Sequence, residues 1–147
     1  MGINLADKYY IQAFDNYSFN MEEAIEALNY ALSHDPEHSG AHFLLGRTNM
    51  EYLQNFEQAE YHFQMALVNG PSPRVYVYYS LLLIKLKEYK KAQKLIDHAK
   101  KVKGINEAAL LHREALILER TGDLESAKKL YEVAFDESFE EDERIFL

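Results

Sequence analysis

Small and large apolar residues recur along this chain with a period of about 34 residues. In each period an Ala is followed four positions later by a large apolar residue and three positions after that by another Ala. The periods begin at Ala24, Ala59, Ala92 and Ala127, which are 35, 33 and 35 positions apart. A period of this size is typical of helical solenoids, in which each helical hairpin buries its apolar face by stacking on the next. The large residues in the middle of the pattern are Leu28, Phe63, Ile96 and Tyr131.

Helix start and stop signals divide each period into two helices. Asn20 with Glu23 and Asn55 with Gln58 have the spacing of capping boxes, and Ser72-Pro73 pairs a capping residue with proline at the first helical position. Further N-caps are expected at Asn4, Asn106 and Asp123. We therefore predict an all-α fold of four antiparallel helix pairs, with helices over residues 5–17, 21–34, 40–53, 56–69, 73–86, 89–102, 107–120 and 124–136.

Composition excludes several classes of protein. The 147 residues contain no Cys, which excludes a disulfide framework, a thiolate zinc site and a cysteine nucleophile. The longest apolar stretch, Val75 to Ile84, is too short to cross a bilayer. The N-terminus shows no signal-peptide pattern. We expect a cytoplasmic protein without membrane association.

Charge is distributed in three blocks of alternating sign. The net charge is −8 over residues 1–68, +7 over residues 69–103 and −7 over residues 104–147. Alternating blocks argue against general nucleic-acid affinity, which needs an uninterrupted basic face. They are compatible with self-association between the ends and the middle of the chain, so homo-oligomerisation stays open.

The four periods resemble the tetratricopeptide repeat family. Small residues, Gly46, Ser80 and Ala115, stand where the family's two helices approach closely. The second period departs from the family pattern at His42 and Asn49, where aromatic residues are usual, and carries one extra residue near Leu53 to Asn55. Its matching residues are Leu45, Gly46, Ala59, Phe63, Ala66 and Pro71.

The resemblance implies a right-handed superhelical solenoid over residues 1–137. The four repeats would cover about residues 5–38, 39–72, 73–106 and 107–137. Residues 138–147 would form an acidic tail, a short capping helix starting near Phe139, or the start of a fifth unit. Ser138 and Glu141 have capping-box spacing, which favours a new helix start there.

In this family the first helix of each pair lines a concave groove that binds peptides. The lining of this groove is largely apolar, and a contiguous exposed apolar patch usually marks an interaction site. Within it we expect Phe43 and Leu81 to be the chief anchors of a bound peptide. Alternatively, these residues contact one another or a second copy. The matching positions are Tyr9, Ala13, Phe43, Arg47, Met50, Arg74, Val77, Leu81, Ile84, His112 and Leu116, with Asn16, Glu51, Ala109 and Glu119 beside them.

The family's carboxylate clamp for chaperone C-termini is not expected. Of its five positions, here Tyr9, Ala13, Leu44, Arg74 and Tyr78, only Arg74 has a compatible charge. Apolar anchoring with Arg47, Arg74 and Arg113 at the rim instead suits an amphipathic helix or an apolar segment with acidic flanks.

Other chemistry has weaker support in the sequence. Residues 85–103 hold eight Lys, which form either a solvated helix face or a patch for an anionic partner such as nucleic acid. Pro36 and Gly40 interrupt the spacing of His34, His38 and His42, so no metal site or other cofactor is expected. No catalytic motif is present, and we expect no enzyme activity.

The sequence therefore favours a non-catalytic module that binds a peptide of a partner protein in an apolar groove. The alternatives are a small holdase chaperone for an apolar client, similar to secretion chaperones of this family, and nucleic-acid binding through the third repeat. A further alternative is an architectural role with the groove closed by dimerisation.

Overall fold

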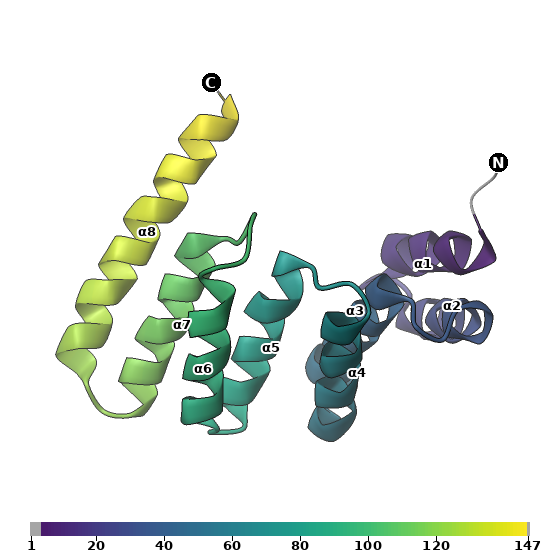
Figure 1. Ribbon diagram of the computed structural model, residues 1–147, viewed down its shortest axis with the longest axis horizontal. Coiled ribbons are helices and arrows are strands. Elements are labelled where there is room, and N and C mark those ends of the chain that lie inside the picture. The colour runs from purple at the N-terminus through teal and green to yellow at the C-terminus, as the bar shows by residue number, and fades with distance from the viewer. Residues whose placement is uncertain (1–3, 147) are drawn as a thin grey trace. The chain divides into compact units, whose positions relative to one another are not determined.

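The structure, a computed structural model, describes the backbone of residues 4–146 and the side chains of residues 4–138. The described residues form helices joined by turns and loops and contain no strand, as the sequence pattern predicts (Figure 1). The helices are α1 (Leu5–Asn16), α2 (Met21–His34), α3 (Ser39–Thr48), α4 (Phe56–Val68), α5 (Pro73–Lys85), α6 (Tyr89–Ala99), α7 (Glu107–Arg120) and α8 (Leu124–Phe146).

Asparagine and aspartate side chains cap most of the helix starts, as predicted. Asn20 accepts the backbone N–H of Glu23 at 3.2 Å, and Asn55 accepts that of Gln58 at 3.3 Å. Asn4, Asn106 and Asp123 make the equivalent bonds at the starts of α1, α7 and α8. These bonds satisfy N–H groups that have no partner inside the helix.

The cap of α3 is a histidine, which the sequence analysis did not anticipate. The Nδ1 atom of His38 accepts the backbone N–H of Ala41 at 3.0 Å. Its Nε2 atom lies 2.7 Å from the Asp7 carboxylate of α1. Because Nδ1 is the acceptor, Nε2 carries the proton and donates to Asp7. His38 thereby links the starts of two helices from successive repeats.

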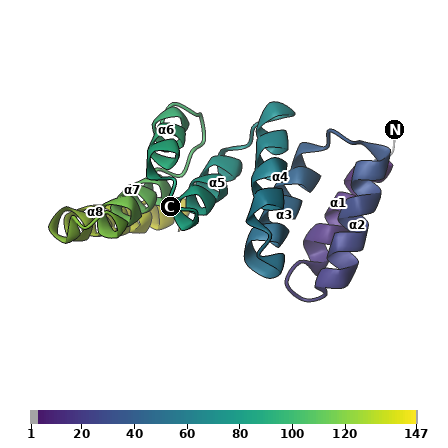
Figure 2. The ribbon, with the colours of Figure 1, turned by 90° about the horizontal axis from the view of Figure 1, so that it is seen from below.

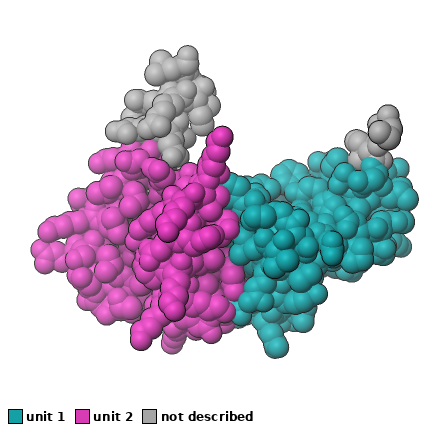
Figure 3. Space-filling model, viewed as in Figure 1, with its two compact units in different colours: residues 1–75 teal, residues 76–147 magenta. Residues whose placement is uncertain are grey.

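Unit 1, residues 1–75, is one of two compact units (Figure 3). In it α1 packs against α2, α3 packs against α4, and α2 packs against α3 (Figure 2). The fully buried Leu28 of α2 shares a core cluster with Leu44 and Leu45 of α3. The prediction that this repeated large residue fills the gap to the next helix pair is confirmed at Leu28.

Close packing of α3 on α4 depends on a glycine. A Cβ atom placed on Gly46 would lie 2.5 Å from the ring of Phe63, which is itself fully buried. Such a separation is far below van der Waals contact. Gly46 is therefore required for the approach of the two helices, as the repeat pattern indicates.

Unit 2 covers residues 76–147. In it α7 packs against α8 and α6 packs against α7. The Tyr76 ring of α5 lies 5.7 Å from the His98 ring of α6. Ala92, Ile96 and Ala99 of α6 are fully buried, as the repeat pattern requires.

The structure differs from the predicted helices mainly at two places, and α6 also ends at Ala99 instead of residue 102. Residues 49–53 form a π-helical turn, η1 (Asn49–Leu53), which continues α3 and ends at Gln54 in the left-handed region with φ of 54°. A π turn absorbs one residue more than an α turn, so η1 accommodates the extra residue of the second period.

The second difference concerns the end of the chain. The expected separate capping helix near Phe139 is wrong, because α8 runs without a break from Leu124 to Phe146. No Gly or Pro occurs in this segment to end the helix, so the capping-box spacing at Ser138 lies inside it. Among the described residues, no helix is both long and apolar enough to cross a membrane.

Candidate functional site

The clearest polar cluster in unit 1 joins Tyr17, Arg47 and Glu51. Tyr17 donates its hydroxyl hydrogen bond to Glu51 at 2.7 Å, and Arg47 Nε donates to the same carboxylate at 3.1 Å. The Arg47 guanidinium also lies over the Tyr17 ring, 4.7 Å from its centroid. Burial and then the bond to Glu51 raise the pKa of Tyr17, which keeps the hydroxyl protonated as a donor. The three groups hold one another in fixed positions.

Repeat geometry brings this cluster together. Tyr17 and Glu51 are 34 positions apart, one period of the sequence pattern, so they occupy equivalent places after the first helix of successive pairs. Arg47 and Glu51 are four residues apart and lie along α3 and η1. The spacing of Arg47 and Glu51 is visible in the sequence, whereas the participation of Tyr17 was missed.

A second cation–aromatic contact lies in the same unit. Arg74, in the first turn of α5, has its guanidinium 4.9 Å from the centroid of the Phe43 ring on α3. Phe43 is buried, with 4% of its surface exposed, whereas Arg74 is exposed. Stacking uses the face of the guanidinium plane and leaves its N–H edge able to bind a carboxylate. Unit 1 thus presents two arginines that are each oriented by an aromatic ring.

The predicted groove residues of unit 1 are less exposed than an open apolar stripe requires. Ala13, Phe43 and Met50 are 0, 4 and 3% exposed. Tyr9 is partly exposed and packs against the rings of Tyr30 and His34. The cause is the close packing of the helices together with the coverage of Phe43 by Arg74. The accessible part of this face is therefore more cationic than the sequence suggested.

The predicted groove residues of unit 2 lie on α5 and α7. Val77, Leu81 and Leu116 are partly exposed, Ile84 is buried and His112 is exposed. The apolar side chains at Val77, Leu81 and Leu116 are therefore accessible, whereas the predicted apolar groove residues of unit 1 are largely buried.

Arg113, expected at the rim, is held against the backbone of α5. Its Nε donates to the carbonyl of Val77 at 3.1 Å, and its Nη1 lies 3.0 Å from Nδ1 of His112. Burial, followed by the charge of Arg113, lowers the pKa of His112. His112 is therefore a neutral acceptor, and Arg113 serves to join α7 to α5.

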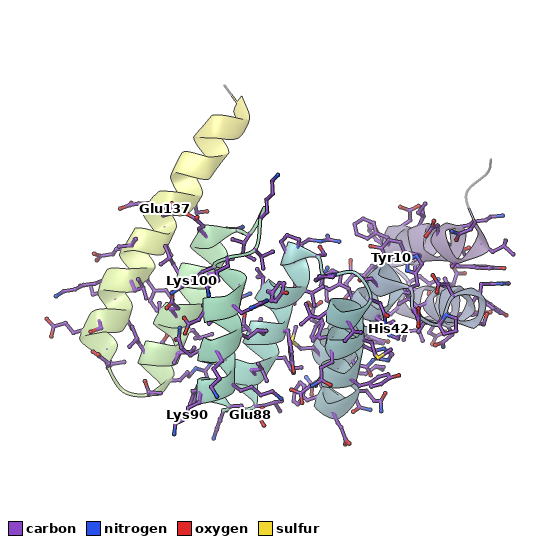
Figure 4. All side chains as sticks on the ribbon, in the orientation of Figure 1. Tyr10, His42, Glu88, Lys90, Lys100 and Glu137 are labelled. Carbon is purple, nitrogen blue, oxygen red and sulfur yellow. The ribbon has the colours of Figure 1, made fainter. Side chains whose placement is uncertain are left out.

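The eight Lys side chains of residues 85–103 are all exposed, and three of them, Lys90, Lys91 and Lys94, lie on α6; two of the eight, Lys90 and Lys100, are labelled in Figure 4. Lys90 is exposed at one end of α6, near Glu88, and Lys100 follows the other end. Lys100 pairs with Glu114 of α7 at 3.1 Å and lies 3.7 Å from Asp97. Part of the positive charge is therefore balanced by neighbouring carboxylates.

Two of the histidines of unit 1, His42 and His62, form a hydrogen-bonded pair. The Nδ1 atoms of His42 and His62 lie 3.0 Å apart, and Nε2 of His42 lies 2.8 Å from the carbonyl of Pro36. His42 donates to that carbonyl, so its Nδ1 accepts the proton of His62. Burial, followed by the charge of His42, lowers the pKa of His62 to about 4. No group of three or more metal-ligating side chains occurs within the described part of the chain.

Comparison with known proteins gives no family assignment. The chain matches no protein-family model, and a search of the curated proteins gives no match.

Proposed function

We propose that the chain is a non-catalytic protein-interaction module of the tetratricopeptide repeat type. In this proposal the helix pairs form a right-handed superhelix, and the first helices of the pairs line the groove that binds a peptide segment of a partner. The main support is the pair of aromatic-stacked arginines, Arg47 and Arg74, on helices that the repeat pattern assigns to the groove.

The arginines define the chemistry of the peptide. Arg47 already shares the carboxylate of Glu51, whereas Arg74 contacts the face of the Phe43 ring. Arg74 is therefore the better donor to an acidic side chain of a bound peptide, since its planar N–H edge matches a carboxylate. A partner carboxylate that draws Arg74 aside would also uncover Phe43 as an apolar anchor.

The apolar part of recognition would come from Val77, Leu81 and Leu116, which are partly exposed. A peptide that combines aliphatic or aromatic residues with acidic ones fits this set. Binding energy in such sites concentrates in a few central apolar and arginine contacts.

Selection from a library of random linear peptides tests the proposal. We expect enriched peptides to combine apolar residues with Asp or Glu. Titration calorimetry should show that Arg74→Ala and Leu81→Glu each weaken the best peptide at least about tenfold, equivalent to about 1.4 kcal/mol. Arg120→Ala, at an exposed arginine near the end of α7, is the matched control and should bind like the native chain.

Two results would contradict the proposal. One is a selection that enriches no peptide. The other is equal loss of affinity in the Arg74→Ala and Arg120→Ala variants, because this would show that general positive charge, and not the stacked arginine, holds the peptide.

A further inference from the structure

The large residue in the middle of the repeat pattern has a different environment in the fourth repeat. Leu28, Phe63 and Ile96 are each 0% exposed. Leu28 is covered by the core residues of α3, and Ile96 lies on α6, which packs against α7. Tyr131 holds the same place on α8 and is partly exposed. The helices that carry Leu28 and Ile96 each pack against the helix that follows them.

Two hollows flank Tyr131 on the hairpin of α7 and α8. Their volumes are about 460 and 430 Å³, and Tyr131 and Phe135 line both. The first hollow also includes Leu124, and the side chains of Leu124 and Phe135 are 65 and 71% exposed. Exposed apolar side chains around a hollow are typical of an interaction site. We call this surface the α8 face.

The charged residues that line the first hollow are mostly acidic. They are the carboxylates of Glu119, Glu132 and Asp136 and the ammonium of Lys128. The Tyr131 hydroxyl donates to Glu119 at 2.6 Å, which places one carboxylate beside the apolar floor. A partner with basic side chains around an apolar stripe matches this distribution.

The junction of α6 with α7 shows how this chain pairs charges across a similar stack. Lys100, just after α6, meets Glu114 of α7 at 3.1 Å, and Gln93 of α6 donates to the same carboxylate at 3.2 Å. The basic element there is covered by a helix with an acidic side chain. On the α8 face the signs are reversed, so the covering helix should be basic.

We propose that the α8 face binds an amphipathic helix of a partner protein, with Lys or Arg beside its apolar stripe. Its apolar side chains fill the two hollows around Tyr131 and Phe135, and its basic residues face Glu119, Glu132 and Asp136. The first helices of a second copy are disfavoured, because residues 1–68 and residues 104–147 carry net charges of −8 and −7. Arg74 and Phe43 line neither hollow, whereas His112 of the proposed groove lines the second, so the two sites are tested with different variants.

Two designed helical peptides test the inference on the full chain. They share one leucine stripe and differ only in Lys or Glu at the flanking positions, and their binding is measured by fluorescence anisotropy. We expect the Lys peptide to bind at least tenfold more tightly than the Glu peptide. The double variant Glu132→Lys, Asp136→Lys should reverse this preference.

Exposed phenylalanines supply the matched pair of variants. The Phe135→Ala substitution should weaken the affinity for the Lys peptide at least tenfold. The Phe19→Ala substitution, at a side chain of unit 1 that is 87% exposed, should leave this affinity unchanged. Arg74→Ala should also leave this affinity unchanged, which separates the test from that of the groove. Circular dichroism verifies that each variant keeps its helicity.

Three outcomes would overturn the inference. The first is equal affinity for the two peptides, and the second is an unchanged preference in the charge-reversed variant. The third is a dimer of the native chain, seen in sedimentation, that the Phe135→Ala substitution dissociates but that the Lys peptide does not dissociate. The occupant of the α8 face would then be a second copy.

Discussion

The guanidinium of Arg74 lies 4.9 Å from the centroid of the Phe43 ring. Phe43 also lies 6.3 Å from the Phe63 ring in the core between α3 and α4. A residue expected to anchor a peptide is therefore also part of the packed interior, with an arginine above it. The first consequence is that binding and stability are coupled at Phe43.

Phe43→Ala should lower the free energy of unfolding by about 3–5 kcal/mol, the range for removing a buried aromatic ring. Arg74→Ala should cost about 0.5–1 kcal/mol, because the cation–aromatic contact is near the surface. Urea denaturation followed by circular dichroism measures both. A cost below about 1 kcal/mol for Phe43→Ala would show that the ring contributes little to the interior.

Gly46→Ala should destabilise the chain by about 1–3 kcal/mol, the usual cost of overpacking. The added methyl group meets the Phe63 ring. Phe63→Leu should therefore cost less in the Gly46→Ala background than in the native chain, since the smaller side chain leaves room for the methyl group. Additive costs in this double-mutant cycle would contradict the contact.

Lowering the pH should destabilise the chain through His62. Its pKa is about 4 in the folded chain against an ordinary 6.5. Between these values the unfolded chain binds a proton that the folded chain does not, so stability present above pH 6.5 is lost as the pH falls toward 4. The loss should be well below the roughly 3.5 kcal/mol that this shift represents at about 1.4 kcal/mol per pKa unit, because the His62 ring is partly exposed and solvent screens its charge.

His62→Gln should reduce this pH dependence in denaturation curves recorded between pH 7 and pH 4. His34→Gln is the control, because His34 is exposed on α2, and it should keep the native slope. If the His62→Gln variant and the native chain have the same slope, the His42–His62 pair is not its source.

His38→Ala should cost about 1–2 kcal/mol, because it removes the N-cap of α3 and the contact with Asp7. Asp7→Ala removes only the second contact and should cost less. Thermal unfolding of the two single variants and the double variant separates the contributions. Equal costs for the two single variants would assign the effect to the contact between helices and not to the cap.

Local signals made most of the fold predictable. Caps such as Asn20 and Asn55 depend on a few neighbouring residues, and the repeated Ala positions mark buried helix faces. The extra residue of the second period was visible, but whether a loop or a π turn absorbs it depends on the packing of α3. The continuity of α8 was missed, because a capping-box spacing at Ser138 does not start a helix where no residue interrupts the preceding one.

The candidate site was harder to predict, because its contacts join distant segments. Tyr17 with Glu51, and Arg74 with Phe43, are pairs that only the folded chain brings together. Helical periodicity assigned Phe43 and Met50 to one face, but not the depth at which that face lies. Their burial follows from how closely neighbouring helices pack, which a single sequence does not specify.

The most direct test of the proposed groove is a ¹H–¹⁵N NMR titration of the full chain with the best peptide from the library selection. We expect the largest shifts at the amides of Arg47, Arg74 and Leu81 and at the Nε–H of Arg74. Shifts confined to the Lys-rich face of α6 or to the α8 face would contradict the assignment of the peptide site to the first helices of the pairs.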